Sequence, residues 1–274
     1  LLGSDNGGTV TPTDASVTTA KLVDANVTKA KLADSVDIFA GTSLSAADLG
    51  TGIHIKTADS SGDVSTSADN LVIEDSGDSG MTILGGTSNH SRINFGDSGD
   101  NDIGQITYDH GANAINIKTN ANGSIYIDAD GHVTMARQSA FLAYPAAQQS
   151  NMSSGTDLIF GTEVTDRNAD HNASTSVFTA PVTGLYHFGF SIRLQEVPND
   201  AAYVLITVPT SNRVYYYIYD TGVFDEQGAY IEFNGSYFAD MDANDTAKVQ
   251  YTQSGGTTST DMSAASYFYG YLVC

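Results

Sequence analysis

The sequence predicts an all-β protein in which a slender β-repeat region precedes a β-sandwich. Gly, Ser, Thr, Asn, Asp and β-branched residues outnumber helix formers in the 274-residue chain, which is typical of short strands joined by turns. Short apolar dyads recur about every ten residues in the first half. Most of the 15 tyrosines follow Tyr144, whereas the first hundred residues have few aromatic rings. We therefore expect a compact aromatic domain after a thinner region.

A ten-residue repeat occupies residues 14–34. The segment 14–23 (DASVTTAKLV) is followed by 24–33 (DANVTKAKLA), and Asp34 begins a third copy. In one continuous α-helix a ten-residue step would turn the apolar positions by roughly 80° per repeat, because the helix has 3.6 residues per turn. Short turns and extended pieces fit the pattern better. We predict that residues 1–40 form an N-terminal decad-repeat stalk.

The segment 41–136 carries apolar residues in pairs at i and i+2, separated by turn-rich stretches such as 75–80 (DSGDSG). The pairs are Ile53/Ile55, Leu71/Ile73, Met81/Ile83, Ile93/Phe95, Ile106/Tyr108, Ile115/Ile117, Ile125/Ile127 and Val133/Met135. Each strand offers only two inward residues, which is too few to close a core within one chain. Stacking repeats or winding identical chains together would bury them. We predict an interwound β-repeat shaft over 41–136.

The strands lengthen and become aromatic after residue 136. Alternate positions in the stretch 184–194 are apolar, which predicts a half-buried antiparallel strand with one face in the core. The predicted core residues are Tyr186, Phe188, Phe190, Ile192 and Leu194. The opposite face, with His187, Gly189, Ser191 and Arg193, is predicted to be the wetter side.

A turn is predicted to lead into this strand. Pro181 presets its own φ and Gly184 tolerates a positive φ, so residues 180–184 have the composition of a turn. Farther along, 203–208 and 214–219 are apolar on both faces, which predicts cover on both sides by a second sheet or a partner subunit. The tyrosine-rich run 214–219 is typical of a core or an interface, and a ligand platform is the alternative.

The composition excludes several classes of partner. A net charge of −21 opposes binding to nucleic acid or to an anionic membrane, since both rely on Lys and Arg. No apolar stretch approaches membrane-spanning length, so we expect no membrane insertion. Cys274 is the only cysteine, which excludes an intrachain disulfide. Because the sequence starts Leu1-Leu2-Gly3 without Met, we expect a processed product or a piece of a longer chain.

Catalytic motifs are weak in this sequence. The GDSG tetrapeptides at 77–80 and 96–99 superficially resemble the nucleophile segment of trypsin-like proteases, but the flanking residues, histidine motif and disulfides of that family are missing. We predict that both are turns. A carboxylate pair for glycoside hydrolysis stays an open alternative, because an acidic chain offers many such pairs. Our expectation is that the chain has no catalytic residues and is not an enzyme.

Carboxylate clusters raise the question of calcium. The segment 128–131 (DADG) begins like a calcium loop, but no glutamate stands at the twelfth position, so we predict a hairpin turn. Two other clusters, which are exposed acidic turns or calcium sites, are Asp97/Asp100/Asp102 and Asp240/Asp242/Asp245. The six histidines show no metal-binding spacing. We expect no cofactor, with calcium left open and metal ligands unassigned.

The C-terminal part resembles the C1q/TNF-like jelly-roll domain. The pattern Phe-x-x-Pro-x-x-Gly-x-Tyr-x-Phe runs from Phe178 to Phe188, and 266–273 (SYFYGYLV) matches the closing strand of that family. Further matching residues are Ala140, Phe141, Leu158, Ile159, Phe160, Asn168, Gly235, Ser236 and Asp245. The resemblance covers residues 137–274 and implies a jelly-roll sandwich that assembles as a homotrimer. Residues 195–230 match the family poorly.

The N-terminal half resembles bacteriophage tail fibres. The Val-Thr-Thr-Ala-Lys-Leu decads carry this resemblance, together with the phrases NFGD (94–97), ITYD (106–109) and DGHVTM (130–135). It covers residues 14–136 and implies a homotrimeric virion fibre. With the C-terminal resemblance, it predicts an all-β homotrimer in which an elongated trimeric β-rich shaft is followed by a C1q/TNF-like jelly-roll head over 137–274.

The two resemblances imply attachment as the function. A virion tail fibre would hold its trimeric head away from the particle, so that head loops meet a glycan or protein on the host cell surface. Other virion tail proteins are further expected partners, and the expected location is the virion, outside the cell. Two alternatives stay open: a structural fibre or decoration protein whose head drives trimerisation, and a secreted bacterial C1q-like adhesin.

One loop is predicted to bind the receptor. If the first and last strands of the head pair antiparallel beside the shaft, the loop 253–261 lies near the tip. Its small hydroxyl side chains suit hydrogen bonds to sugars, and a flexible polar connector is the alternative. The predicted receptor-binding residues are Ser254, Thr257, Thr258, Ser259 and Asp261.

Overall fold

A computed structural model describes residues 53–223 and 225–274, and the predicted stalk over 1–40 lies outside this part. The chain divides into two compact units, Leu1–Ile83 and Leu84–Cys274. In the first unit, β1 (Ile53–Lys56) and β2 (Leu71–Glu74) form a parallel pair. Among the described residues, no helix is both long and apolar enough to cross a membrane.

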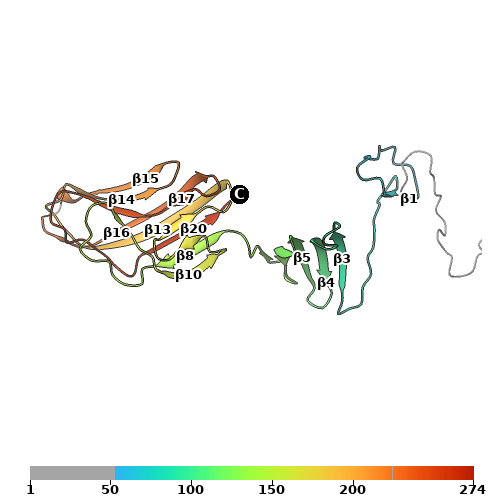
Figure 1. Cartoon of the computed structure of the whole chain (residues 1–274), viewed down its shortest axis with the longest axis horizontal. Coiled ribbons are helices and arrows are strands. Elements are labelled where there is room, and N and C mark those ends of the chain that lie inside the picture. Colours follow the sequence, from blue (N-terminus) through green and yellow to red (C-terminus); the bar gives the residue numbers. More distant parts are fainter. Residues whose placement is uncertain (1–52, 224) are drawn as a thin grey trace, which may run out of the picture. The chain divides into compact units, whose positions relative to one another are not determined.

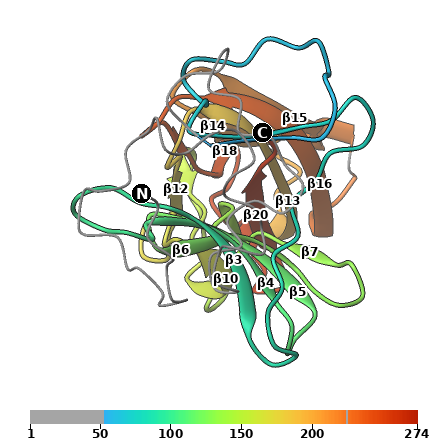
Figure 2. The ribbon, with the colours of Figure 1, turned by 90° about the vertical axis from the view of Figure 1, so that its right-hand side faces the viewer.

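The second unit begins with a five-stranded antiparallel meander. Its strands are β3 (His90–Phe95), β4 (Gly104–Asp109), β5 (Ala114–Thr119), β6 (Asn122–Ile127) and β7 (Val133–Thr134). Figure 2 shows β3, β4 and β5 side by side. The dyad positions from Ile93 to Val133 therefore lie in strands, as predicted, but these strands pair within one chain. Met81 and Ile83 lie outside any strand.

One side of this meander is apolar, and we call it the apolar sheet face. Its residues are Ile93, Phe95, Ile106, Tyr108, Ile115, Ile117, Ile125, Ile127 and Val133. The opposite side is polar. Ile106 on the apolar side is 41% exposed, whereas its neighbour Gln105 on the polar side is 6% exposed. The apolar side is thus the more open one, which reverses the usual arrangement of a half-buried sheet.

The hairpin predictions for this region are confirmed. Residues 128–131 connect β6 to β7, with Gly131 at a φ of 86° and the Gly131 N–H donating to the Asp128 carbonyl at 3.1 Å. In the GDSG segment 96–99, the Asp97 carboxylate accepts hydrogen bonds from the backbone N–H groups of Gly99 and Asp100. An aspartate that bonds its own turn in this way stabilises the local fold, as the turn prediction for this segment expects.

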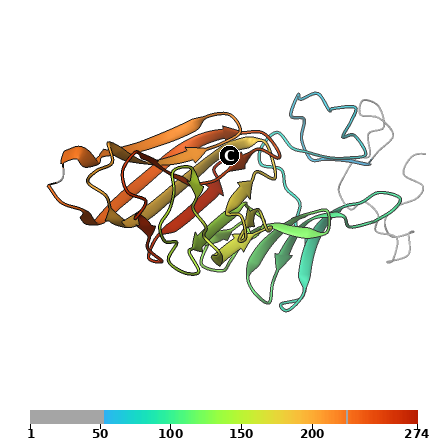
Figure 3. The same ribbon diagram turned by 60° about the vertical axis from the view of Figure 1, so that its left-hand side comes forward.

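The region after residue 137 is a two-layer β-sandwich (Figures 1 and 3). One layer is a six-stranded sheet in which β10, β8, β20, β13 and β16 are neighbours in that order and β19 also pairs with β13. The strands are β8 (Ala140–Tyr144), β10 (Thr162–Arg167), β13 (Gly184–Val197), β16 (Gly228–Met241), β19 (Asp261–Met262) and β20 (Tyr267–Leu272). All these pairs are antiparallel.

The second layer contains a four-stranded and a three-stranded sheet. The four-stranded sheet has β15 (Val214–Asp220), β14 (Tyr203–Pro209), β18 (Gln250–Ser254) and β9 (Thr156–Asp157) as neighbours in that order. The three-stranded sheet consists of β11 (His171–Asn172), β12 (Val177–Thr179) and β17 (Thr246–Ala247). A bridge between Thr210 and Ala247 connects the two. The described chain is almost entirely β, as predicted, with one 3-10 turn, η3 (Thr221–Val223).

The core of the sandwich lies where the alternation of β13 predicted it. Tyr186, Phe188, Phe190, Ile192 and Leu194 are all buried. Aromatic rings from other strands pack against them, with the Phe141 and Phe268 ring centroids 5.0 Å apart and those of Phe178 and Phe188 5.2 Å apart. Such contacts bring distant parts of the sequence together and hold the two layers.

The predicted role of Gly184 is wrong. Gly184 begins β13 and does not have a positive φ. A Cβ at this position would instead collide with the Cys274 carbonyl and the Leu272 side chain. The glycine is needed because the C-terminal residues cross close to the backbone, while residues 181–183 make the bend before the strand.

Tyrosines of β15 cover the free edge of β16. The Tyr215 and Tyr217 hydroxyls donate to the carbonyls of Phe238 and Ser236 at 2.7 and 3.2 Å, and Asn212 Nδ2 donates to the Asp240 carbonyl at 2.8 Å. These three hydrogen bonds satisfy alternate carbonyls of an edge strand, which would otherwise be free to pair with a strand of another chain. The tyrosine-rich run is therefore covered on this side, but Tyr216 and Ile218 on the other side are exposed, so the predicted second cover is not found in the described chain.

Candidate functional site

The outward side of the six-stranded sheet carries a group of aromatic and apolar residues, which we call the aromatic sheet face. Its members come from β8, β13, β16 and β20: Leu142, Tyr144, Leu185, His187, Phe238, Tyr267, Tyr269 and Tyr271. Strand register places them in rows across the sheet, for example Tyr271 beside His187 and His187 beside Phe238. Phe238 is 58% exposed, so this face offers apolar surface to a partner.

His187 lies in the middle of the aromatic sheet face. Its ring centroid is 5.1 Å from those of Phe238 and Tyr271 and 6.0 Å from that of Tyr269. The His187 Nδ1 atom is buried and has no hydrogen-bond partner in the described structure. An unpartnered buried polar atom of this kind requires an explanation, and a bound water, an ion or a group from another molecule would each supply one.

The prediction of a wetter side for β13 is confirmed only in part, because His187 and Arg193 keep intermediate exposure whereas Gly189 and Ser191 do not. Gly189 is buried beneath the Tyr269 ring of β20, and the buried Ser191, the register partner of Tyr267, donates its hydroxyl to Glu232 Oε1 at 2.8 Å. Only Arg193, at the border of the face, keeps a charged pairing, with Arg193 Nη2 3.5 Å from Glu232 Oε2. The alternation of β13 alone does not reveal this cover, because the covering ring comes from a strand about 80 residues later.

The eight residues of the aromatic sheet face include no carboxylate, lysine or arginine, and the charged pairs Arg193–Glu232 and Arg213–Asp240 lie at its border. Burial raises the pKa of the Tyr269 hydroxyl above its ordinary value, and the neighbouring Tyr267 and Tyr271 act in the same direction. The Tyr269 hydroxyl therefore stays protonated at physiological pH. In a chain of net charge −21, such a neutral surface is where two copies can meet with little charge repulsion.

The loop predicted to bind a receptor lies at one end of the sandwich. β13 starts at Gly184, where Leu185 bonds to the Cys274 carbonyl, and reaches Leu194 and Gln195 beside β19. Ten residues of strand correspond to about 30 Å, so loop 253–261 and the C-terminus lie at opposite ends of the domain. β8 and β20 are antiparallel, which meets one part of the condition for the tip placement, and the position of this end relative to the predicted shaft stays a prediction.

Three of the five predicted receptor-binding side chains already have partners in their own chain. Thr257 Oγ1 donates to Asp200 Oδ2 at 2.9 Å, and Ser259 Oγ donates to the Glu196 carbonyl at 2.8 Å. Asp261 is 8% exposed, and its carboxylate accepts from Gln148 and from the Asn151 backbone N–H.

The other two predicted residues are more open to solvent. Thr258 is exposed, and Ser254 ends β18 with intermediate exposure. The receptor-binding role of all five residues stays a prediction, and Thr258 has the side chain best placed to meet a ligand.

Carboxylates converge at a different place from the two predicted calcium clusters. Among the described residues, the ligand atoms of Asp128, Asp130 and His132 lie within 4.8 Å of one another. His132 Nδ1 is 2.9 Å from Asp128 Oδ2, and this contact lowers the pKa of the Asp128 carboxyl. Hydrogen bonds within the hairpin therefore explain why these three side chains lie together. Calcium binding at the two predicted clusters stays a hypothesis.

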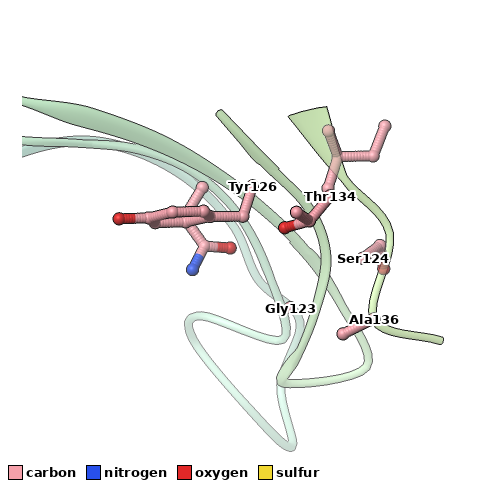
Figure 4. Close-up of a pocket in the computed structure, with 7 residues that line it drawn as sticks. Gly123, Ser124, Tyr126, Thr134 and Ala136 are labelled. Atoms are coloured by element: carbon pink, nitrogen blue, oxygen red, sulfur yellow. The ribbon is translucent and has the colours of Figure 1, made fainter. Parts of the chain in front are cut away.

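A pocket of about 320 Å³ opens on the polar side of the five-stranded sheet (Figure 4). Tyr126 and Thr134 lie on its wall, together with Asn116, Gly123, Ser124, Ile125 and Ala136. Its volume is at the lower limit for small-molecule sites, and its lining residues are uncharged. We assign no ligand to it.

Comparison with known proteins identifies the sandwich. The sequence of residues 140–273 matches the family model of the C1q domain. These residues form a C1q domain. The strand order described above agrees with the predicted jelly-roll sandwich, and the matched residues fall within the predicted head, 137–274. No curated protein matches the sequence.

Solved structures similar to the chain include two related domains. The globular domain of zebrafish complement 1qA is 16% identical, and the similarity covers 50% of this chain and 98% of that one with a TM-score of 0.38. Murine APRIL at pH 8.5 is 14% identical, with 50% and 99% covered and a TM-score of 0.37. The C1q assignment rests on the family match.

The aromatic sheet face was missed as a unit, although its signal is present in the sequence. In the closing strand (YFYGYL, 267–272), Phe268, Gly270 and Leu272 alternate with three tyrosines. Phe268 is buried in the core, so the tyrosines must point outward, where a soluble domain would ordinarily place polar groups. An outward row of tyrosines is typical of an interface.

Proposed function

We propose that this chain is a homotrimeric attachment protein, a virion tail fibre or spike that binds a host surface glycan or protein through its C-terminal C1q domain. The aromatic sheet face carries this proposal. It is neutral, largely aromatic and partly open, and it contains the unpartnered His187 Nδ1, which are the properties of a subunit interface. The phage-fibre resemblance of residues 14–136 supports the virion assignment.

Binding is proposed at the loop end of the domain. The loop 253–261 is fixed by Asp200 and Glu196, so a ligand would meet a shaped surface. Exposed hydroxyl groups there suit a sugar, and three copies would raise the avidity of weak single sites. The proposal requires no catalytic residue. It places the protein outside the cell, on the virion, where other virion tail proteins would bind the end of the fibre away from the receptor-binding loops.

The test uses the full chain and a panel of immobilised bacterial surface polysaccharides. Thr258→Trp places a large ring on the exposed loop, and Ala243→Trp places the same ring on an exposed turn at the opposite end of the domain. We expect at least tenfold weaker binding for Thr258→Trp, unchanged binding for Ala243→Trp and an unchanged mass in solution for both. Equal binding by both variants would remove the loop from the proposal.

Two alternatives predict different results. The first alternative is a structural fibre or decoration protein, which the extent of uncovered apolar and aromatic surface favours. It would form trimers that bind neither the polysaccharides nor bacterial cells. A secreted bacterial C1q-like adhesin predicts binding to a surface without any effect on phage adsorption. Competition between the purified chain and intact phage particles for host cells therefore separates the three functions.

A further inference from the structure

The apolar sheet face of the β3–β7 meander has no cover in the described chain. Six of its large side chains are between 37% and 58% exposed: Ile93, Phe95, Ile106, Tyr108, Ile115 and Val133. A single-layer sheet with an open apolar side is not stable in water by itself, because domains bury such a side against a second layer. The sheet therefore requires an occupant on this side.

Register arranges this surface in two continuous rows. Ile93, Ile106, Ile117 and Ile125 are neighbours across β3, β4, β5 and β6, and Tyr108, Ile115, Ile127 and Val133 form the next row across β4, β5, β6 and β7. Rows of this kind form a ridged apolar surface that can interdigitate with an identical one.

The charge of the chain indicates what the occupant is. The apolar sheet face holds no carboxylate, lysine or arginine among the described residues of this sheet, whereas the chain as a whole carries −21. Two copies that meet here avoid contact between like charges. The charged residues of these strands, which include Arg92, Asp109 and Lys118, lie on the polar side of the same sheet.

The exposed area comes close to that of the smaller specific interfaces. With side-chain areas of 150–250 Å², the exposed fractions correspond to roughly 500 Å² of apolar surface on each chain. That approaches the roughly 600 Å² per partner of the smaller specific interfaces. Such an interface is too weak to be permanent alone, but it adds to a second contact on the same chain.

We propose that copies of this chain pack their apolar sheet faces against one another, which makes residues 90–134 a self-association layer separate from the C1q domain. Folding of the meander is then coupled to assembly. This inference does not depend on attachment to a host, so failure of the polysaccharide experiment leaves it intact.

The test places single cysteines on the two sides of β3 in the full chain with Cys274→Ser. Ile93→Cys lies on the apolar sheet face, and Asn94→Cys lies on the other side one residue later, also exposed. Under mild oxidation we expect Ile93→Cys to form disulfide-linked chains at least ten times faster than Asn94→Cys. Equal rates, or no link from Ile93→Cys, would contradict the proposal.

A second variant tests the coupling of folding to assembly. Ile106→Lys places a charge in the middle of the apolar sheet face, and we expect faster amide hydrogen exchange across β3–β7 with no change in β13. Thr119→Lys, on the exposed end of β5, is the control. The unsubstituted protein gives the opposing outcome. If its β3–β7 amides stay protected from exchange while its mass in solution is that of a single chain, another segment of the same chain covers the face, and self-association is wrong.

Discussion

The ring of Tyr269 lies on the backbone of Gly189. The two residues are direct partners in the β13–β20 register, and a Cβ added to Gly189 would overlap the Tyr269 ring and hydroxyl. Glycine is therefore what allows a tyrosine to lie flat across β13 and to complete the neutral aromatic surface. A residue in the predicted wetter side of a strand thus supports the interface we propose.

Gly189→Ala tests this relationship. The added methyl group must push Tyr269 away, and overpacking of this kind costs about 1–3 kcal/mol. We expect lower stability in urea and weaker association in sedimentation equilibrium. Gly161→Ala is the control, because the nearest atoms to a Cβ there lie at 3.5 and 3.6 Å, an ordinary contact distance. Loss of association in the control as well would show that the effect is not specific to Tyr269.

Substitutions of two phenylalanines test the core and the proposed interface separately. Phe188 is fully buried, so Phe188→Ala should lower the free energy of unfolding by about 3–5 kcal/mol at any protein concentration. Phe238 is mainly exposed in one chain, so Phe238→Ala should change stability only where the protein is assembled. Urea unfolding at two concentrations measures the difference. A concentration-independent loss for Phe238→Ala would argue against an interface on this face.

The pH response of the loop end follows from Asp200. Hydrogen bonds from the Thr257 backbone and side chain lower the pKa of the Asp200 carboxyl below its ordinary value. The ionised form thus stabilises the loop. This contribution is fully present above the unfolded-state value of about 4 and is lost as pH falls through the lowered folded-state value.

The measurement is the exchange rate of the Thr257 amide, followed from pH 6 to pH 2 after correction for intrinsic exchange. We expect loss of protection only in the acid part of this range. Asp200→Asn should abolish the pH dependence and leave the loop less protected throughout. A flat profile in the unsubstituted protein would show that the loop is held by other contacts.

Asp261 allows a structural role to be separated from a binding role. Its buried carboxylate accepts two hydrogen bonds, so Asp261→Ala should destabilise the domain by about 1.5–3 kcal/mol. Thr258→Ala, at an exposed position, should change stability by less than about 0.5 kcal/mol. If Asp261→Ala weakens ligand binding without loss of stability, Asp261 acts as a direct ligand contact.

Local patterns predicted most of the strands and the core. The alternation from Tyr186 to Leu194 identified buried residues correctly, because successive side chains of a strand point to opposite faces. The dyads between Ile93 and Val133 identified the meander for the same reason. The role of Gly184 could not be predicted, since it depends on where the C-terminal residues cross β13.

The sequence by itself determined that the chain is β-rich, acidic and thin in its first half, and that its C-terminal half carries a C1q pattern. Composition and two-residue spacing are local properties, so they can be read without a fold. Only the tertiary structure decided that Tyr144, His187 and Tyr269, from strands far apart in sequence, share one face. It also decided that Thr257, Ser259 and Asp261 bond to their own chain, because pairing between distant loops depends on register and not on residue type.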